Sequence, residues 1–165
     1  PYYCKTIDYR GGDYGIGILS KREPLRTVSG DLPGTEARKF FLAEFDDYTF
    51  IATHLCHLET TNRAQSVEII NAYIAANYAS YTKPIFLAGD FNDTPSSYTY
   101  RTMKGDMTDG FRDSGSGYGG TFRYLGGVLR IDYIFYDDAF EGIRYYMPPE
   151  DVSDHKAVVA ELGFR

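Results

Sequence analysis

The chain has 165 residues, of which 43% are hydrophobic and 24% are charged, and its formal net charge is −6. This length fits one hydrophobic core, and no stretch approaches the roughly 18 consecutive apolar residues of a membrane-spanning helix. The acidic balance disfavours non-specific binding of long nucleic acid, which depends on positive charge. We therefore expect one domain over residues 1–165. Its cellular location is unknown, with a secreted or periplasmic location left open.

The first part of the chain predicts mostly strands. Residues 14–20, where glycines alternate with apolar residues, are expected to form one strand, and residues 30–34 a turn. Residues 38–45 and 48–55 are rich in aromatic and β-branched residues and predict a hairpin. The second strand of this hairpin leads into a polar segment.

That segment reads Thr-His-Leu-Cys-His. Because successive strand residues point to opposite faces, His54 and Cys56 are expected on one face and His57 on the other. A zinc site is disfavoured, since it needs about four nitrogen or sulfur ligands and no second Cys/His cluster exists. For His54 alone, a structural and a functional role both stay open.

A helix is predicted from residue 60 to about residue 80, capped by Thr60 or Thr61. Its apolar stripe has three- and four-residue spacing and consists of Ala64, Val67, Ile70, Ile74 and Tyr78. The next apolar run, residues 84–89, is typical of a strand buried on both faces. A helix followed by a buried strand is an αβ unit, so the sheet is expected to be mixed.

Two polar side chains, Asp90 and Asn92, follow this buried strand. In extended backbone, positions two apart point to the same side, so both would converge at the carboxyl end of a central strand. This is where α/β sheets commonly bind ligands, and oxygen ligands suit a hard cation such as Mg²⁺. A simple Asx-turn would also explain the sequence, so both interpretations stay open.

The last third predicts a short helix at residues 97–104 and a Gly/Ser-rich loop at residues 109–120. Strands are expected at residues 129–135 and 157–162. Asp132 lies in the middle of the first of these strands, where a carboxylate is costly without a partner. Its partner should be a cation, a histidine or a metal.

A further ligand-bearing turn, Val-Ser-Asp-His, contains Asp154 and His155 and precedes the final strand. Four segments now carry polar residues at strand ends, in the order Thr-His-Leu, Gly-Asp-Phe-Asn, Arg-Ile-Asp-Tyr-Ile-Phe and Ser-Asp-His. Together they resemble the endonuclease/exonuclease/phosphatase family, from Tyr14 to the end of the chain. The resemblance implies a DNase I-like, four-layered α/β sandwich of two mixed sheets flanked by helices.

The resemblance also implies hydrolysis of a phosphate ester by in-line attack of an activated water. The implied cofactor is Mg²⁺, with Mn²⁺ or Ca²⁺ as alternatives. Asp90 would align or deprotonate the water, and Asn92 would hold a phosphate oxygen. Asp154, Asp90 and Asn92 are the implied metal-binding residues.

The same resemblance assigns the histidines. His155 would contact the phosphate and stabilise the charge of the pentacovalent state, while Asp132 would orient its imidazole. His54 falls where several family members place a second phosphate-facing histidine. The implied substrate-binding residues are therefore His54, Asn92 and His155.

One feature of the family has no counterpart in this sequence. Family members carry, upstream of the strand at residues 14–20, an asparagine and a glutamate that is the main metal ligand. We therefore expect residues 1–165 to be an N-terminally incomplete domain, inactive alone and completed by an N-terminal segment of the same protein. The alternative is a catalytically incompetent domain of the same fold that binds a phosphorylated ligand or a protein partner.

The substrate is predicted only by elimination. The acidic balance and the lack of a basic stripe favour a small or soluble phosphate ester, while nucleic acid stays open as a substrate. No basic amphipathic helix or apolar loop indicates docking on a membrane lipid.

Overall fold

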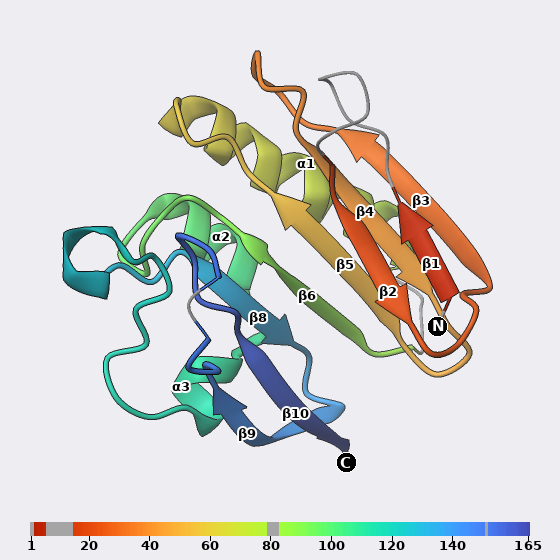
Figure 1. Ribbon diagram of the computed structural model, residues 1–165. Helices are drawn as coiled ribbons and strands as arrows, with labels where there is room; N and C mark the ends of the chain where they lie inside the picture. Colours follow the sequence, from red (N-terminus) through yellow and green to blue (C-terminus); the bar gives the residue numbers. More distant parts are fainter. Residues whose placement is uncertain (1, 6–14, 79–82, 151) are drawn as a thin grey trace.

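A computed structural model describes residues 2–5, 15–78, 83–150 and 152–165 (Figure 1). The strands are β1 (Tyr2–Lys5), β2 (Gly17–Ser20), β3 (Arg26–Asp31), β4 (Lys39–Glu44), β5 (Thr49–His54), β6 (Ile85–Asp90), β7 (Thr108–Asp109), β8 (Asp132–Tyr136), β9 (Phe140–Tyr146) and β10 (Val159–Phe164). The helices are α1 (Thr60–Tyr78), α2 (Tyr98–Lys104), α3 (Gly110–Ser114) and a short 3₁₀ helix, η1 (Tyr124–Gly127).

Six strands form the main sheet, in the order β3-β4-β5-β6-β8-β7. The neighbours β5 and β6 are parallel and are connected through α1, whereas the other neighbours are antiparallel. The mixed sheet expected from the αβ unit is confirmed. Two antiparallel pairs, β1 with β2 and β9 with β10, lie outside this sheet.

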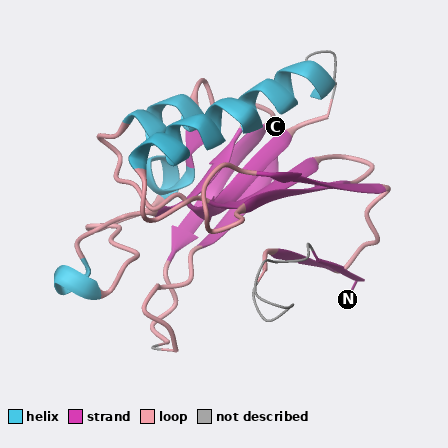
Figure 2. Cartoon of the chain, turned by 90° about the horizontal axis from the view of Figure 1, so that it is seen from above, coloured by secondary structure: helices cyan, strands magenta, loops and turns pink. Residues whose placement is uncertain are grey.

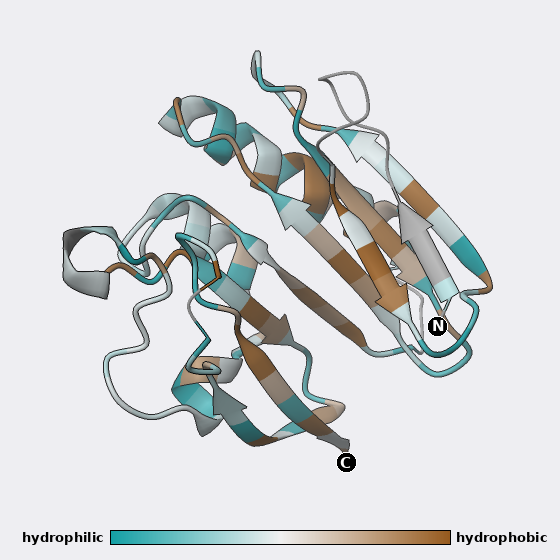
Figure 3. Ribbon diagram, viewed as in Figure 1, coloured by the Kyte–Doolittle hydropathy of each residue, from teal (hydrophilic) through white to brown (hydrophobic). Residues whose placement is uncertain are grey.

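Both faces of the main sheet are covered. The helices α1 and α2 lie over one face (Figure 2), and the core beneath them includes Leu42, Ile51, Leu87, Tyr133 and Phe135. The opposite face carries a second cluster that joins β2 to β4 and β5, as well as a groove of about 440 Å³ lined by side chains of β5, β6, β8 and β10. Hydrophobic segments accordingly run along β5, β8 and β10 (Figure 3). The expected α/β sandwich with helices around mixed strands is confirmed.

The helix α1 packs through the stripe predicted from its sequence. Val67, Ile70 and Tyr78 are buried, and burying such side chains contributes about 1.5–3 kcal/mol each. Arg63 is buried on the same helix and joins it to the loop after β6 through a 3.2 Å ion pair with Asp93. The predicted end of the helix, near residue 80, lies outside the described residues. No helix in the described part of the chain is long and apolar enough to cross a bilayer.

Several sequence-based expectations are wrong in detail. The predicted loop at residues 109–120 contains α3, because the side chain of Asp109 caps this helix by accepting from the amides of Phe111 and Arg112. The predicted turn at residues 30–34 overlaps β3, which extends to Asp31. The strand β9 was not predicted, since charged residues and a glycine interrupt its apolar pattern.

Candidate active site

Three polar residues lie side by side at the ends of central strands of the main sheet, where β5 and β6 end and β8 begins. His54 pairs in register with Asp90 across β5 and β6, and Asp90 pairs with Asp132 across β6 and β8. Asp132 is the first residue of β8 rather than its middle, and β8 runs antiparallel to β6. Its side chain therefore lies beside the carboxyl-terminal ends of β5 and β6.

A cavity of about 470 Å³ lies at these strand ends. Its lining contains all six residues singled out in the sequence, with His57 and Phe122 in addition: His54, His57, Asp90, Asn92, Phe122, Asp132, Asp154 and His155. These side chains come from strand ends and loops that are far apart in the sequence. The fold thus brings together every residue that the sequence patterns predicted for the site.

Asn92 is held directly against Asp90. Its backbone amide donates to Asp90 Oδ1 at 2.8 Å, and its side-chain Nδ2 donates to Leu55 O at 2.9 Å and to Asp90 Oδ2 at 3.3 Å. The backbone of Asn92 has φ of 51°, in the left-handed region that few non-glycine residues adopt. The Asx-turn and the convergence of both side chains on one cavity are therefore present together.

His155 is oriented by Asp132. Its Nδ1 lies 2.8 Å from Asp132 Oδ2, and since an ionised carboxylate only accepts, Nδ1 is the donor. Its Nε2 faces Asp90, 3.9 Å from Oδ2, and the ring packs on Phe122 with 4.9 Å between centroids. Burial alone would lower the pKa of His155, but the hydrogen bond and charge of Asp132 raise it.

Asp132 is itself fixed by a buried threonine. The backbone amides of Ile131 and Asp132 both donate to Thr121 Oγ1 at 3.1 Å. The carbonyl of Thr121 accepts from the amide of Lys156, next to His155. Thr121 therefore joins the two segments that carry the Asp132–His155 pair.

Negative charge is left unbalanced at the centre of the cavity. Burial, followed by the charge of Asp132, raises the pKa of Asp90 to about 6. Within the described ranges Asp90 forms no ion pair with lysine or arginine, and the ionisable nitrogens nearest to its carboxylate are those of His54 and His155, at 3.3 and 3.9 Å. A bound cation would relieve this repulsion between carboxylates.

The donor atoms also fit a cation. Asp90, Asp132 and His155 each offer one atom, all within 4.8 Å of one another. Carboxylate oxygens are ligands that hard divalent cations prefer. Of the carboxylates expected from the sequence to bind the cation, Asp90 belongs to this cluster, whereas the exposed Asp154 lines the same cavity outside it. Asn92 lines the cavity as well, with its side chain bound to Asp90.

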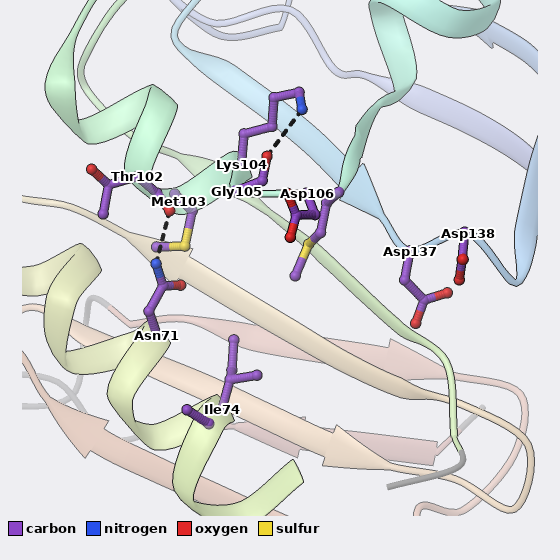
Figure 4. A pocket seen from close by; sticks show the side chains of 11 residues that line it. Asn71, Ile74, Thr102, Met103, Lys104, Gly105, Asp106, Asp137 and Asp138 are labelled. Carbon is purple, nitrogen blue, oxygen red and sulfur yellow. Dashed lines mark hydrogen bonds between the residues drawn. The ribbon is translucent and has the colours of Figure 1, made fainter. Parts of the chain in front are cut away.

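A second cavity, of about 450 Å³, lies between α1, α2 and the turn after β8 (Figure 4). Two of its polar side chains are bound to backbone carbonyls. Asn71 Nδ2 donates to Thr102 O at 2.8 Å, and Lys104 Nζ donates to Gly105 O at 3.1 Å. Among the described residues, no pairing of strands brings charged side chains together here, as it does at the ends of β5 and β6. The first cavity is therefore the better candidate for an active site.

The model of the endonuclease/exonuclease/phosphatase family matches residues 1–155. The chain belongs to this family. The match begins upstream of Tyr14, the residue from which the sequence resembles the family. It includes each of the segments that bring polar side chains to the cavity.

Solved structures of the family have the same fold. A mannosyl-6-phosphatase from Bacteroides thetaiotaomicron aligns with a TM-score of 0.81 and 22% identity, covering 99% of this chain and 78% of that one. The human nocturnin catalytic domain with bound sulfate aligns at 0.77 and 16% identity, covering 99% and 72%. A sphingomyelinase C from Streptomyces griseocarneus aligns at 0.71 and 18%, covering 97% and 77%. A search of curated protein sequences gives no significant match.

Sequence patterns alone missed part of the cavity wall. His57 was expected on the face opposite His54, but β5 ends at His54, so the strand alternation stops there. His57 lines the cavity, and Cys56 is buried instead. Phe122 and Thr121 come from a loop without apolar periodicity, and only their position shortly before the Asp132 strand could have drawn attention to them.

Proposed function

We propose that the protein hydrolyses a phosphate ester by in-line attack of a water molecule. One observation carries this proposal: His54, Asp90 and Asp132 form a single row across three strands, and His155 is bound to the end of that row. The row combines a carboxylate of raised pKa with two histidines around one cavity. That is the set of groups that water activation and phosphate binding require.

Asp90 is the proposed base. A pKa of about 6 lies close to neutral pH, which favours transfer of a proton from water to a carboxylate. The oxygen of that water forms a bond to phosphorus while the ester P–O bond breaks, and the proton passes to Asp90. Asn92, anchored to Asp90 and Leu55, would hold a phosphate oxygen in line with the attack.

The histidines are proposed to bind the phosphate. His155, with its pKa raised by Asp132, would place a positive charge beside the equatorial oxygens. Asp132 accepts the hydrogen bond from Nδ1–H of His155, and in the protonated ring Nε2 carries a second N–H that faces the cavity. His54 would donate to the phosphate from the opposite side of Asp90.

Asp90 and Asp132, with Asn92 and Asp154 lining the same cavity, are the residues that would hold a divalent cation, which we propose to be Mg²⁺. When bound, the cation supplies positive charge to the phosphate oxygens and lowers the pKa of a coordinated water. The nitrogen of His155 suits this hard cation less well than the carboxylates do, in keeping with its proposed place as the partner of Asp132.

We propose a small or soluble phosphate ester as the substrate, with nucleic acid as the alternative. The net charge of −6 supports this choice. The names of the similar structures refer to unlike substrates, a mannosyl phosphate and a sphingomyelin. At 22% and 18% identity, these similarities support the fold and do not identify the substrate.

The full-length protein should be assayed with Mg²⁺ and with EDTA against bis-p-nitrophenyl phosphate, p-nitrophenyl phosphate, sugar phosphates, sphingomyelin and single-stranded DNA. We expect hydrolysis of at least one ester that EDTA abolishes. Retained binding of a phosphorylated ligand, with no turnover of any ester, would instead support the catalytically incompetent alternative.

A further inference from the structure

The segment before β4 reaches the cavity through an unusual backbone. Gly34 has φ of 116° and Ala37 has φ of 49°, so a non-glycine residue takes up a left-handed conformation here. The amide of Leu32 donates to the carbonyl of Arg38 at 2.8 Å and closes the loop. Such strained conformations persist only where the surroundings enforce them. The loop presents Glu36 and Arg38 to the wall formed by His54 and His57.

Arg38 contacts His54 on the side away from Asp90. Its Nη1 lies 2.8 Å from His54 Nδ1. A guanidinium can only donate hydrogen bonds, so Nδ1 of His54 is the acceptor and carries no proton. The proton of the neutral ring is then on Nε2, which lies 3.3 Å from Asp90 Oδ2 at the cavity.

Glu36 holds this arrangement in place. Its Oε1 accepts from Arg38 Nη2 at 3.2 Å and lies 2.5 Å from His57 Nδ1, and its Oε2 accepts from the amide of His57 at 3.0 Å. Burial would raise the pKa of Glu36, but hydrogen bonds from Cys56 and His57 and the charge of Arg38 lower it to about 2. The ionised carboxylate therefore fixes Arg38 and His57 together.

We propose that Arg38, anchored by Glu36, is a positioning residue that keeps His54 as a neutral imidazole with its N–H on Nε2. His54 then donates a hydrogen bond to the substrate phosphate and does not bind the cation through Nε2. The step to substrate rests on the proposed function, whereas the tautomer does not. His155 also directs its Nε2 to the cavity, but its Nδ1 is bound to a carboxylate, whereas Nδ1 of His54 is bound to a guanidinium. His54 is thus a neutral hydrogen-bond donor to the phosphate, and His155 is a cationic one.

A further observation supports this assignment. Nε of Arg38 is buried and finds no hydrogen-bond partner among the described residues, an arrangement that costs stability. The guanidinium is therefore held through its two terminal nitrogens, Nη1 at His54 and Nη2 at Glu36.

The tautomer can be measured without activity, by long-range ¹H–¹⁵N NMR of the histidines in the metal-free, full-length protein at neutral pH. We expect His54 to show an unprotonated Nδ1 and a protonated Nε2. A proton on Nδ1 in the parent protein would overturn the inference directly. In Arg38→Met this single tautomer should be lost, whereas Arg38→Lys, which retains a donor, should restore it in part.

Arg22→Met is the matched control, because it removes an arginine that pairs with Asp47 at 2.7 Å on the surface. It should leave the His54 signals unchanged. In an active protein, Arg38→Met should lower kcat by about 10- to 100-fold, the usual effect of losing such a support, with KM changed by less than about threefold. An altered tautomer with unchanged kcat would overturn the catalytic part. The expected tautomer in an inactive parent protein would refute the proposed hydrolysis but not the role of Arg38.

Discussion

Two buried carboxylates of the same sheet have opposite surroundings. Asp109, in β7, receives Arg130 Nη1 and Nη2 at 2.8 Å each and the hydroxyl of Tyr100 at 2.6 Å. Burial would raise its pKa, but these bonds lower it. Asp90, in β6, faces a second carboxylate, Asp132, and its pKa is raised to about 6.

The difference separates a carboxylate that stabilises the fold from one that is available for catalysis. The side chain of Asp90 is 16% exposed and that of Asp109 is 1% exposed, so greater burial cannot explain the raised pKa of Asp90. The Asp109 pair is neutral overall and joins β7 to the segment before β8, whereas the charge of Asp90 is left for something outside the chain to balance. We therefore look for function at Asp90 and for stability at Asp109.

The largest effect is expected on turnover. Asp90→Asn removes the proposed base and one cation ligand, so kcat should fall by about 100-fold or more, equivalent to about 3 kcal/mol. Steady-state kinetics of the full-length protein measure this. Asp138→Asn, at an exposed carboxylate in the turn between β8 and β9, is the control and should leave the rate unchanged. A loss of less than about threefold at Asp90 would contradict the assignment.

The opposite pattern is expected for Asp109→Asn. The charge of Arg130 would remain buried without its partner, so the free energy of unfolding should drop by about 3–5 kcal/mol. Urea denaturation measures the loss, and the rate per folded molecule should stay close to that of the parent. If stability were unchanged and turnover were lost, the distinction between the two carboxylates would be wrong.

The sequence predicts the ends of β5 and β6 well, because apolar strands that stop at polar residues are visible without a structure. His54, Asp90 and Asn92 were identified in this way, Asp132 as a carboxylate inside an apolar strand, and Asp154 and His155 in a turn beside one. The parallel and antiparallel pairing then places them on one edge.

Glu36 and Arg38 could not be predicted, because nothing local marks them. At or just before the start of a predicted strand, such residues look like ordinary surface charges. They reach the site only because Ala37 takes up a left-handed backbone and Leu32 closes the loop over long-range contacts. The short helix α3 was hidden for a similar reason, since its cap, Asp109, is placed by the buried Arg130.

A smaller effect is expected on the pH profile. In Asp132→Asn, His155 loses the partner that raises its pKa, so the cation is deprotonated at lower pH. The basic limb of the kcat/KM profile should shift downward, because the protonated ring is the active form. An unchanged limb in a stably folded variant would show that another group controls it.

The smallest effect concerns stability against pH in the absence of divalent cations. A carboxylate whose folded pKa is raised is harder to ionise in the folded state, so its ionisation lowers stability as pH rises. Between pH 3.8 and about 6 the parent should therefore lose stability relative to Asp90→Asn, with no further divergence above that window. Thermal unfolding of both proteins across this range would reveal parallel curves if the view of Asp90 were mistaken.

The most direct test is the titration of the Asp90 carboxyl carbon by ¹³C NMR, with and without Mg²⁺, using Asp109 as the internal reference. We predict a pKa of about 6 for Asp90 without metal and a clear fall when Mg²⁺ is added. The pKa of Asp109 should lie below its usual range and stay there in both conditions. A pKa for Asp90 near that of an exposed aspartate, or one that Mg²⁺ does not move, would contradict the account that unbalanced charge at this position makes the site.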